Sequence, residues 1–191
     1  MGKGIVERLK NEFGIFDEWI GYELHPETPA GGIPLELLFP GADAGKMLEN
    51  LRRAGEPYGI AFSPLRFLVN TRLALEASEY ARERGKFAEM HARLFEAYFL
   101  KGRNIGEKQT VLEVGREAGL NADELRDHLD AHTYFPRLQS ARRLGQKYGV
   151  RGLPTFIFPG NGKIVGARPY ETFREAVMAA AKTAPPDQQE G

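Results

Sequence analysis

Polar and apolar residues alternate with a helical period over most of the chain. Ile5, Leu9 and Phe13 are four residues apart and predict an amphipathic helix over residues 4–13. The same spacing recurs in one segment after another between residues 44 and 148, so we expect this region to be all-helical. A further stripe predicts a helix over residues 172–182.

Asparagine, proline and glycine mark the ends of several predicted helices. Asn70 and Asn121 are expected N-cap residues, because their side chains can accept hydrogen bonds from free N–H groups of the first turn. Pro136 suits the first turn of a helix, where its missing N–H costs nothing. Gly119 and Gly149 are expected to end helices in the left-handed conformation.

Two short runs have the composition of β-strands. Residues 19–24 are aromatic and β-branched and predict one strand, and residues 155–158, Thr-Phe-Ile-Phe, predict another. A Pro-Gly-Asn-Gly turn at residues 159–162 predicts that residues 163–167 return as a hairpin. The strand at 155 is entered through a proline, which costs no ladder hydrogen bond there and is a candidate for a cis peptide bond.

Two segments do not fit a long regular element. Prolines and glycine pairs interrupt residues 26–46, which predict an irregular loop, and its apolar run 35–39 is expected to cover the core. Residues 184–191 are polar and proline-rich, so we expect a disordered tail.

Composition and charge exclude several classes of function. The 191 residues carry 26 basic and 26 acidic side chains, so we expect neither nucleic acid nor an anionic membrane as a partner. No apolar stretch is long enough to span a membrane and the N-terminus lacks a signal-peptide core, which predicts a cytoplasmic protein. The chain has no cysteine, which excludes disulfides, thiolate metal ligands and cysteine nucleophiles.

Other chemical motifs are weak. His128 and His132 are four residues apart, but no further ligand motif completes a metal set, so we expect a solvated helix face and no metal. His91 is expected to lie at the edge of the core with a local partner. The pair Arg142-Arg143 indicates ordinary solvated surface.

The segment from Val150 to Phe156, Val-Arg-Gly-Leu-Pro-Thr-Phe, resembles the Gly-Val-Pro-Thr-Phe segment of thioredoxin-fold proteins. The order of predicted elements resembles the DsbA family of thioredoxin-fold oxidoreductases, in particular its FrnE-like branch. Local similarities support this resemblance at Tyr22-Glu23-Leu24-His25-Pro26, where His25 replaces the usual Asn, at Glu96-Ala97-Tyr98-Phe99 followed by Gly102, and at Ala118-Gly119-Leu120.

The resemblance implies an α/β, thioredoxin-like fold with a large all-helical insertion. The thioredoxin-like domain would comprise residues 1–43 and 149–183, and the insertion residues 44–148. In that superfamily a cis-proline faces the active-site dithiol at the start of the first helix, so the resemblance implies a cis bond before Pro154, facing the N-terminus of the helix that starts near Gly4.

The family's Cys-x-x-Cys pair is usually followed by Gly-Lys, and Gly2-Lys3 stand in those positions. We therefore expect a truncated chain, with the dithiol upstream of Met1, the N-terminal central strand missing, and no catalytic residue. The residues implied to bind substrate are Gly2, Lys3, Gly152, Leu153 and Pro154.

Three functions follow from the resemblance. The first is a thiol-disulfide oxidoreductase family member for protein or peptide thiols, redox-inactive as the sequence stands. The second is a protein like the kappa-class glutathione transferases and 2-hydroxychromene-2-carboxylate isomerases, which would use glutathione; otherwise no cofactor is expected. The third is a non-catalytic peptide-binding module. The sequence leaves a homodimer open.

Overall fold

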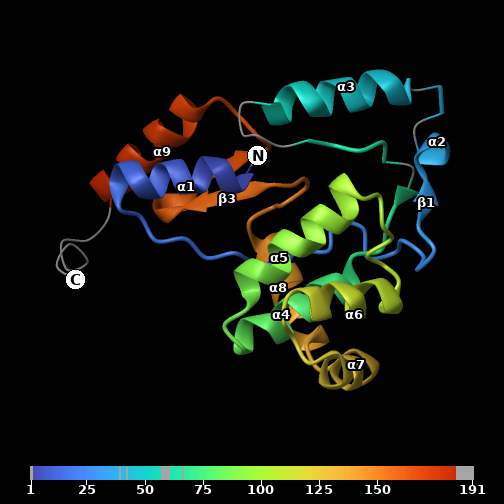
Figure 1. Ribbon diagram of the computed structural model, residues 1–191. Coiled ribbons are helices and arrows are strands. Elements are labelled where there is room, and N and C mark those ends of the chain that lie inside the picture. The colour runs from blue at the N-terminus through green and yellow to red at the C-terminus, as the bar shows by residue number, and fades with distance from the viewer. Residues whose placement is uncertain (1, 39, 42, 57–60, 66, 184–191) are drawn as a thin grey trace. The chain divides into compact units, whose positions relative to one another are not determined.

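The computed structural model describes residues 2–38, 40–41, 43–56, 61–65 and 67–183 (Figure 1). They form two compact units: one combines the described residues up to Trp19 with those from Gly149 on, and the other spans Ile20–Tyr148. The sequence placed the first boundary after residue 43. The observed boundary lies earlier because Tyr22 packs on Gly145 and Glu23 pairs with Arg72, both within the helical unit. The predicted tail at 184–191 lies outside the described residues.

The first unit contains a hairpin and two helices. Its elements are α1 (Gly2–Phe13), β3 (Thr155–Phe158), β4 (Gly162–Val165) and α9 (Tyr170–Thr183). β3 and β4 pair antiparallel with Thr155 opposite Val165 and Phe158 opposite Gly162, and Figure 1 shows α1 and α9 beside them. The helices bury the apolar stripes that predicted them, with Ile5, Leu9 and Phe173 at most 2% exposed.

The second unit is mostly helical, as predicted for residues 44–148. Its longer helices are α3 (Ala44–Gly55), α4 (Arg72–Glu83), α5 (Phe87–Phe95), α6 (Lys108–Glu117), α7 (Ala122–Asp130) and α8 (Phe135–Lys147), and a π-helical turn (Glu96–Leu100) extends α5. The core lies between α4, α5, α6 and α7, where Tyr80, Met90, Val111 and Leu125 are fully buried.

Local signals placed several helix ends correctly. The Asn121 side chain accepts hydrogen bonds from the N–H groups of Asp123 and Glu124, and Gly149 follows α8 with φ of 60°. Asn70 lies one residue before the N-cap position of α4, although its side chain accepts from the N–H of Arg72 at 2.9 Å.

The strand predicted at residues 19–24 is not formed among the described residues. Within the described part of the chain this segment has no ladder partner, and Tyr22 and Glu23 contact helical residues. A Cβ on Gly21 would meet Leu75 at 2.9 Å, and the Tyr22 ring covers Gly145 of α8. The strand prediction was wrong because it rested on an aromatic and β-branched composition, which also suits a segment that packs on helices.

The loop predicted over residues 26–46 contains short regular elements. β1 (Ile33–Pro34) pairs antiparallel with β2 (Phe67–Leu68), and α2 (Leu35–Leu38) follows directly. Leu37 is 71% exposed, so it does not cover a core as expected, and Phe39 lies outside the described residues. Among the helices described, none combines the length and apolarity needed to cross a bilayer.

Candidate functional site

The start of α1 meets the loop that leads into β3. A Cβ placed on Gly2 would lie 3.5 Å from both Cβ and Cγ of Pro154 and 3.6 Å from Cζ of Phe156. The Leu153–Pro154 peptide bond is cis. The structure therefore brings together two segments that are far apart in the sequence, and both carry residues implied by the resemblance.

Packing and polar contacts fix α1 at this place. Its buried face lies against α9, where Phe173 is fully buried. At the other end of α1, Glu12 accepts hydrogen bonds from the Tyr170 hydroxyl at 2.5 Å and from Nε of Arg174 at 2.6 Å. The Tyr170 hydrogen bond is the main cause that lowers the pKa of Glu12.

The loop before β3 is held by its own hydrogen bonds. The Thr155 hydroxyl donates to the carbonyl oxygen of Gly152 at 2.6 Å, and the Gly166 N–H donates to the carbonyl oxygen of Pro154 at 2.8 Å. The Phe156 ring packs edge-on against Phe173 at 4.7 Å between ring centroids. These contacts tie the loop to the hairpin and to α9.

One part of this loop is open. The Leu153 side chain is 49% exposed, and its backbone N–H and C=O have no hydrogen-bond partner among the described residues. Among the strands that the structure describes, β3 pairs with β4 alone, so its other edge has no described partner. An extended peptide could pair with such groups, as in β-strand addition.

The start of α1 adds a positive potential to this opening. The N–H groups of the first helical turn have no partners within the helix, and the helix dipole places partial positive charge at that end. Lys3 is exposed in the same turn. The arrangement attracts an anionic or electron-rich group, but with no cysteine the chain supplies no attacking thiolate.

All five residues implied to bind substrate belong to these two segments. Gly2 lies so close to Pro154 that an added Cβ would touch the proline ring, and Lys3, Gly152 and Leu153 are neighbours of these two residues in the chain. The sequence analysis gave no site role to Phe156, although it lies as close to Gly2 as Pro154 does. The sequence could have indicated this role, because Phe156 directly follows Pro154-Thr155 in a predicted strand.

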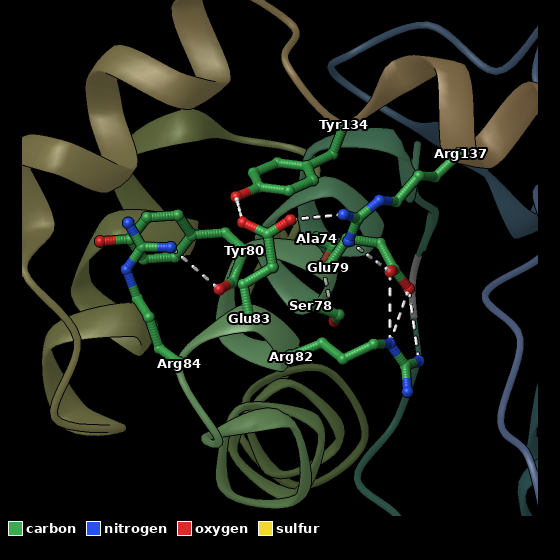
Figure 2. Close-up of polar contacts among 9 residues, drawn as sticks. All are labelled: Ala74, Ser78, Glu79, Tyr80, Arg82, Glu83, Arg84, Tyr134 and Arg137. Atoms are coloured by element: carbon green, nitrogen blue, oxygen red, sulfur yellow. Dashed lines mark hydrogen bonds and ion pairs between the residues drawn. The ribbon is translucent and has the colours of Figure 1, made fainter.

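Figure 2 shows a cluster of charged residues on the helical unit. The Tyr134 hydroxyl donates to Oε2 of Glu83 at 2.6 Å, Arg137 bridges Glu83 and Glu79, and Arg82 binds Glu79. Burial raises the pKa of Tyr134, while the hydrogen bond from Tyr134 lowers the pKa of Glu83. The proton therefore stays on the tyrosine, and the cluster ties α4 to α8 rather than offering a base.

The histidines considered as metal ligands have other partners. His132 lies beyond the end of α7 with φ of 49°, and its Nδ1 is 2.9 Å from Oε1 of the fully buried Glu76. The Nδ1 of His128 is 3.2 Å from the Thr133 hydroxyl. The His132 side chain is 56% exposed, as expected for a solvated position, but the residue lies beyond α7 and not on a helix face. Within the described ranges, no group of three or more potential metal-binding residues occurs.

A proline loop that meets the start of a helix, with a hairpin and a closing helix, defines a protein of the thioredoxin-like class. The family model described as DSBA-like thioredoxin domain matches residues 6–178, and the chain belongs to this family. The Bacillus subtilis (strain 168) protein YwbO, described as uncharacterized, is 26% identical over 188 residues, which cover 95% of this chain and 90% of YwbO.

Two solved structures show the same fold. A crystal structure of a probable DsbA oxidoreductase from Streptomyces coelicolor has a TM-score of 0.86 and 22% identity, covering 97% of this chain and 85% of that chain. A 2-hydroxychromene-2-carboxylate isomerase has a TM-score of 0.67 and 15% identity, covering 94% and 86%. The fold predicted from the resemblance is thus confirmed.

Proposed function

We propose that this DsbA-family chain binds extended protein or peptide segments beside Leu153 and Pro154, and that its 191 residues carry out no thiol-disulfide exchange. The observation that supports this most is that Gly2 lies close to Pro154, next to a half-exposed Leu153 whose backbone groups are unpaired among the described residues. A bound peptide would pair with that backbone and cover the leucine side chain.

The absence of exchange follows from the chemistry. Disulfides exchange by attack of a thiolate on a sulfur, and this chain contains no cysteine to supply a thiolate. We expect the purified chain not to accelerate the reduction of insulin by dithiothreitol. Measurable acceleration that scales with protein concentration would contradict this part of the proposal.

Binding can be tested separately with the insulin B chain, its cysteines replaced by serine. Leu153→Glu places a charge on the proposed contact surface, and covering half of a leucine is worth about 1 kcal/mol, so we expect about five- to tenfold weaker binding. Met178→Glu is the matched control, since Met178 is 42% exposed on α9 of the same unit. Equal affinities of the two variants would contradict the proposed site.

A second candidate is glutathione binding, as in the kappa-class transferases. It is favoured by the structural likeness to the isomerase and by the free N–H groups at the start of α1, which suit a thiolate or carboxylate. Titration with reduced glutathione and with S-methylglutathione separates the candidates. Binding of glutathione but not of the serine-substituted B chain would favour the second.

The remaining parts of the proposal concern partners and location. The unpaired edge of β3 could also pair with a second copy of the chain, which sedimentation would detect as a dimer. We further propose a cytoplasmic location, as predicted from the sequence, and cell fractionation tests it.

A further inference from the structure

One face of α8 lines a pocket on the helical unit. Gln139, Arg142, Arg143 and Gln146 follow the spacing i, i+3, i+4 and i+7, which places them on the same side of the helix. The pocket has a volume of about 220 Å³, and all of its lining residues belong to the unit Ile20–Tyr148. None of these lining residues belongs to the unit that contains Gly2 and Pro154.

The pocket has an excess of positive charge. Arg72, Arg142 and Arg143 line it together with a single carboxylate, that of Glu23. Nε of Arg72 donates to Oε1 of Glu23 at 2.9 Å, and the Glu23 side chain is only 8% exposed. The one acidic group is therefore already neutralised by the most enclosed arginine.

Among the described residues, the other two arginines have no acidic partner in hydrogen-bond contact. Arg143 donates to the Ser140 hydroxyl at 2.8 Å, and neither Arg142 nor Arg143 forms an ion pair within the described part of the chain. The pKa of Glu27 is lowered mainly by a backbone hydrogen bond within Glu27, then by His25 and least by the charge of Arg142, and the Glu27 side chain is 72% exposed. In contrast, Arg137 on the same helix binds two glutamates.

The pocket also has an apolar wall. The guanidinium carbon of Arg72 lies 5.0 Å from the centroid of the Phe135 ring, and Leu138 is buried beside it. The partly exposed Phe135 ring can contact the apolar part of a small ligand, while the guanidiniums are suited to oxyanions.

We propose that this pocket binds a small organic oxyanion, a molecule with a carboxylate or phosphate group attached to a short apolar body. Arg142 and Arg143 hold the oxyanion, the amides of Gln139 and Gln146 add hydrogen bonds, and the body packs on Phe135. α8 itself contains no acidic residue that could compete for the arginines. The proposal does not depend on peptide binding at Leu153.

The test uses the full chain, with phenyl phosphate and benzoate as probes and chloride at matched ionic strength as the reference. Arg142→Gln/Arg143→Gln removes two charges from the pocket. Arg116→Gln/Arg126→Gln removes the same charge from α6 and α7, away from it. We expect the pocket variant to bind the better probe at least about tenfold more weakly, and the control variant to bind it like the wild type.

The location is checked independently by nuclear magnetic resonance, in which the bound probe should shift the ring protons of Phe135. Binding of only one probe identifies the preferred oxyanion and supports the site. Three results would overturn the proposal: no binding above chloride, equal loss in both variants, or binding that leaves the Phe135 ring unchanged. Circular dichroism of both variants verifies that they fold.

Discussion

Gly145→Ala should destabilise the helical unit, although the same change usually stabilises a helix. In an exposed helix interior, alanine is better than glycine by up to about 1 kcal/mol. At this position a Cβ would lie 2.2 Å from Cε2 of Tyr22, 2.9 Å from Cζ and 3.0 Å from Cδ2. Carbon atoms in contact are about 3.5–4.0 Å apart, so the ring would have to move by more than about 1 Å.

Overpacking of this kind costs about 1–3 kcal/mol. Because the overlap is severe, we expect the upper part of that range and a net loss of about 1–2 kcal/mol after the helix gain. Chemical denaturation followed by far-ultraviolet circular dichroism measures the free energy of unfolding. The matched background is Tyr22→Leu, which removes the ring, and there Gly145→Ala should be neutral or stabilising.

A stabilising Gly145→Ala in the wild-type background would refute the reasoning. It would mean that the Tyr22 ring does not lie on α8.

Two further predictions concern the first unit. Phe173→Ala should lower the free energy of unfolding by about 3–5 kcal/mol, because the ring is fully buried. Met178→Ala on the same helix should lower it much less, since Met178 is 42% exposed. Chemical denaturation of the two variants tests this. Tyr170→Phe should raise the pKa of Glu12 toward its ordinary value of 4.5, measured by carboxyl chemical shifts against pH. The pKa of Glu12 is lower in the folded state, so ionised Glu12 stabilises the fold above pH 4.5. This stabilisation is lost as the pH falls through the folded-state pKa. Tyr170→Phe should therefore weaken the loss of stability in acid.

Features coded by neighbouring residues could be predicted from the sequence. The Asn121 cap and the end of α8 at Gly149 depend on single side chains or on one positive φ, and both occur where expected. The strand at Thr155–Phe158 was recognised from its composition and from the turn that follows. The helical stripes were equally clear because each repeats over several turns.

Features that depend on distant partners could not be predicted. β1 forms because Ile33 and Pro34 pair with Leu68 and Phe67. The residues around either segment do not predict this pairing. Residues 20–24 resemble a strand in composition, but tertiary packing decides their conformation.

The same limit applies to the candidate sites. The resemblance indicated the Pro154 loop and Gly2-Lys3, and the structure shows how Gly2 meets Pro154. The pocket on α8 was missed, since the Arg142-Arg143 pair alone looks like ordinary surface. The pair is recognised as part of a pocket only when the structure shows that Arg72 and Glu23, from two other segments, line the same pocket.

The most direct test of the proposed function is a map of backbone amide shifts during titration with the serine-substituted insulin B chain. We predict that the largest changes occur at Gly2, Lys3, Gly152 and Leu153, and that the Leu153 N–H becomes protected from hydrogen exchange as it pairs with the peptide. Saturable binding with unchanged amides at these positions, or no binding at all, would contradict the account.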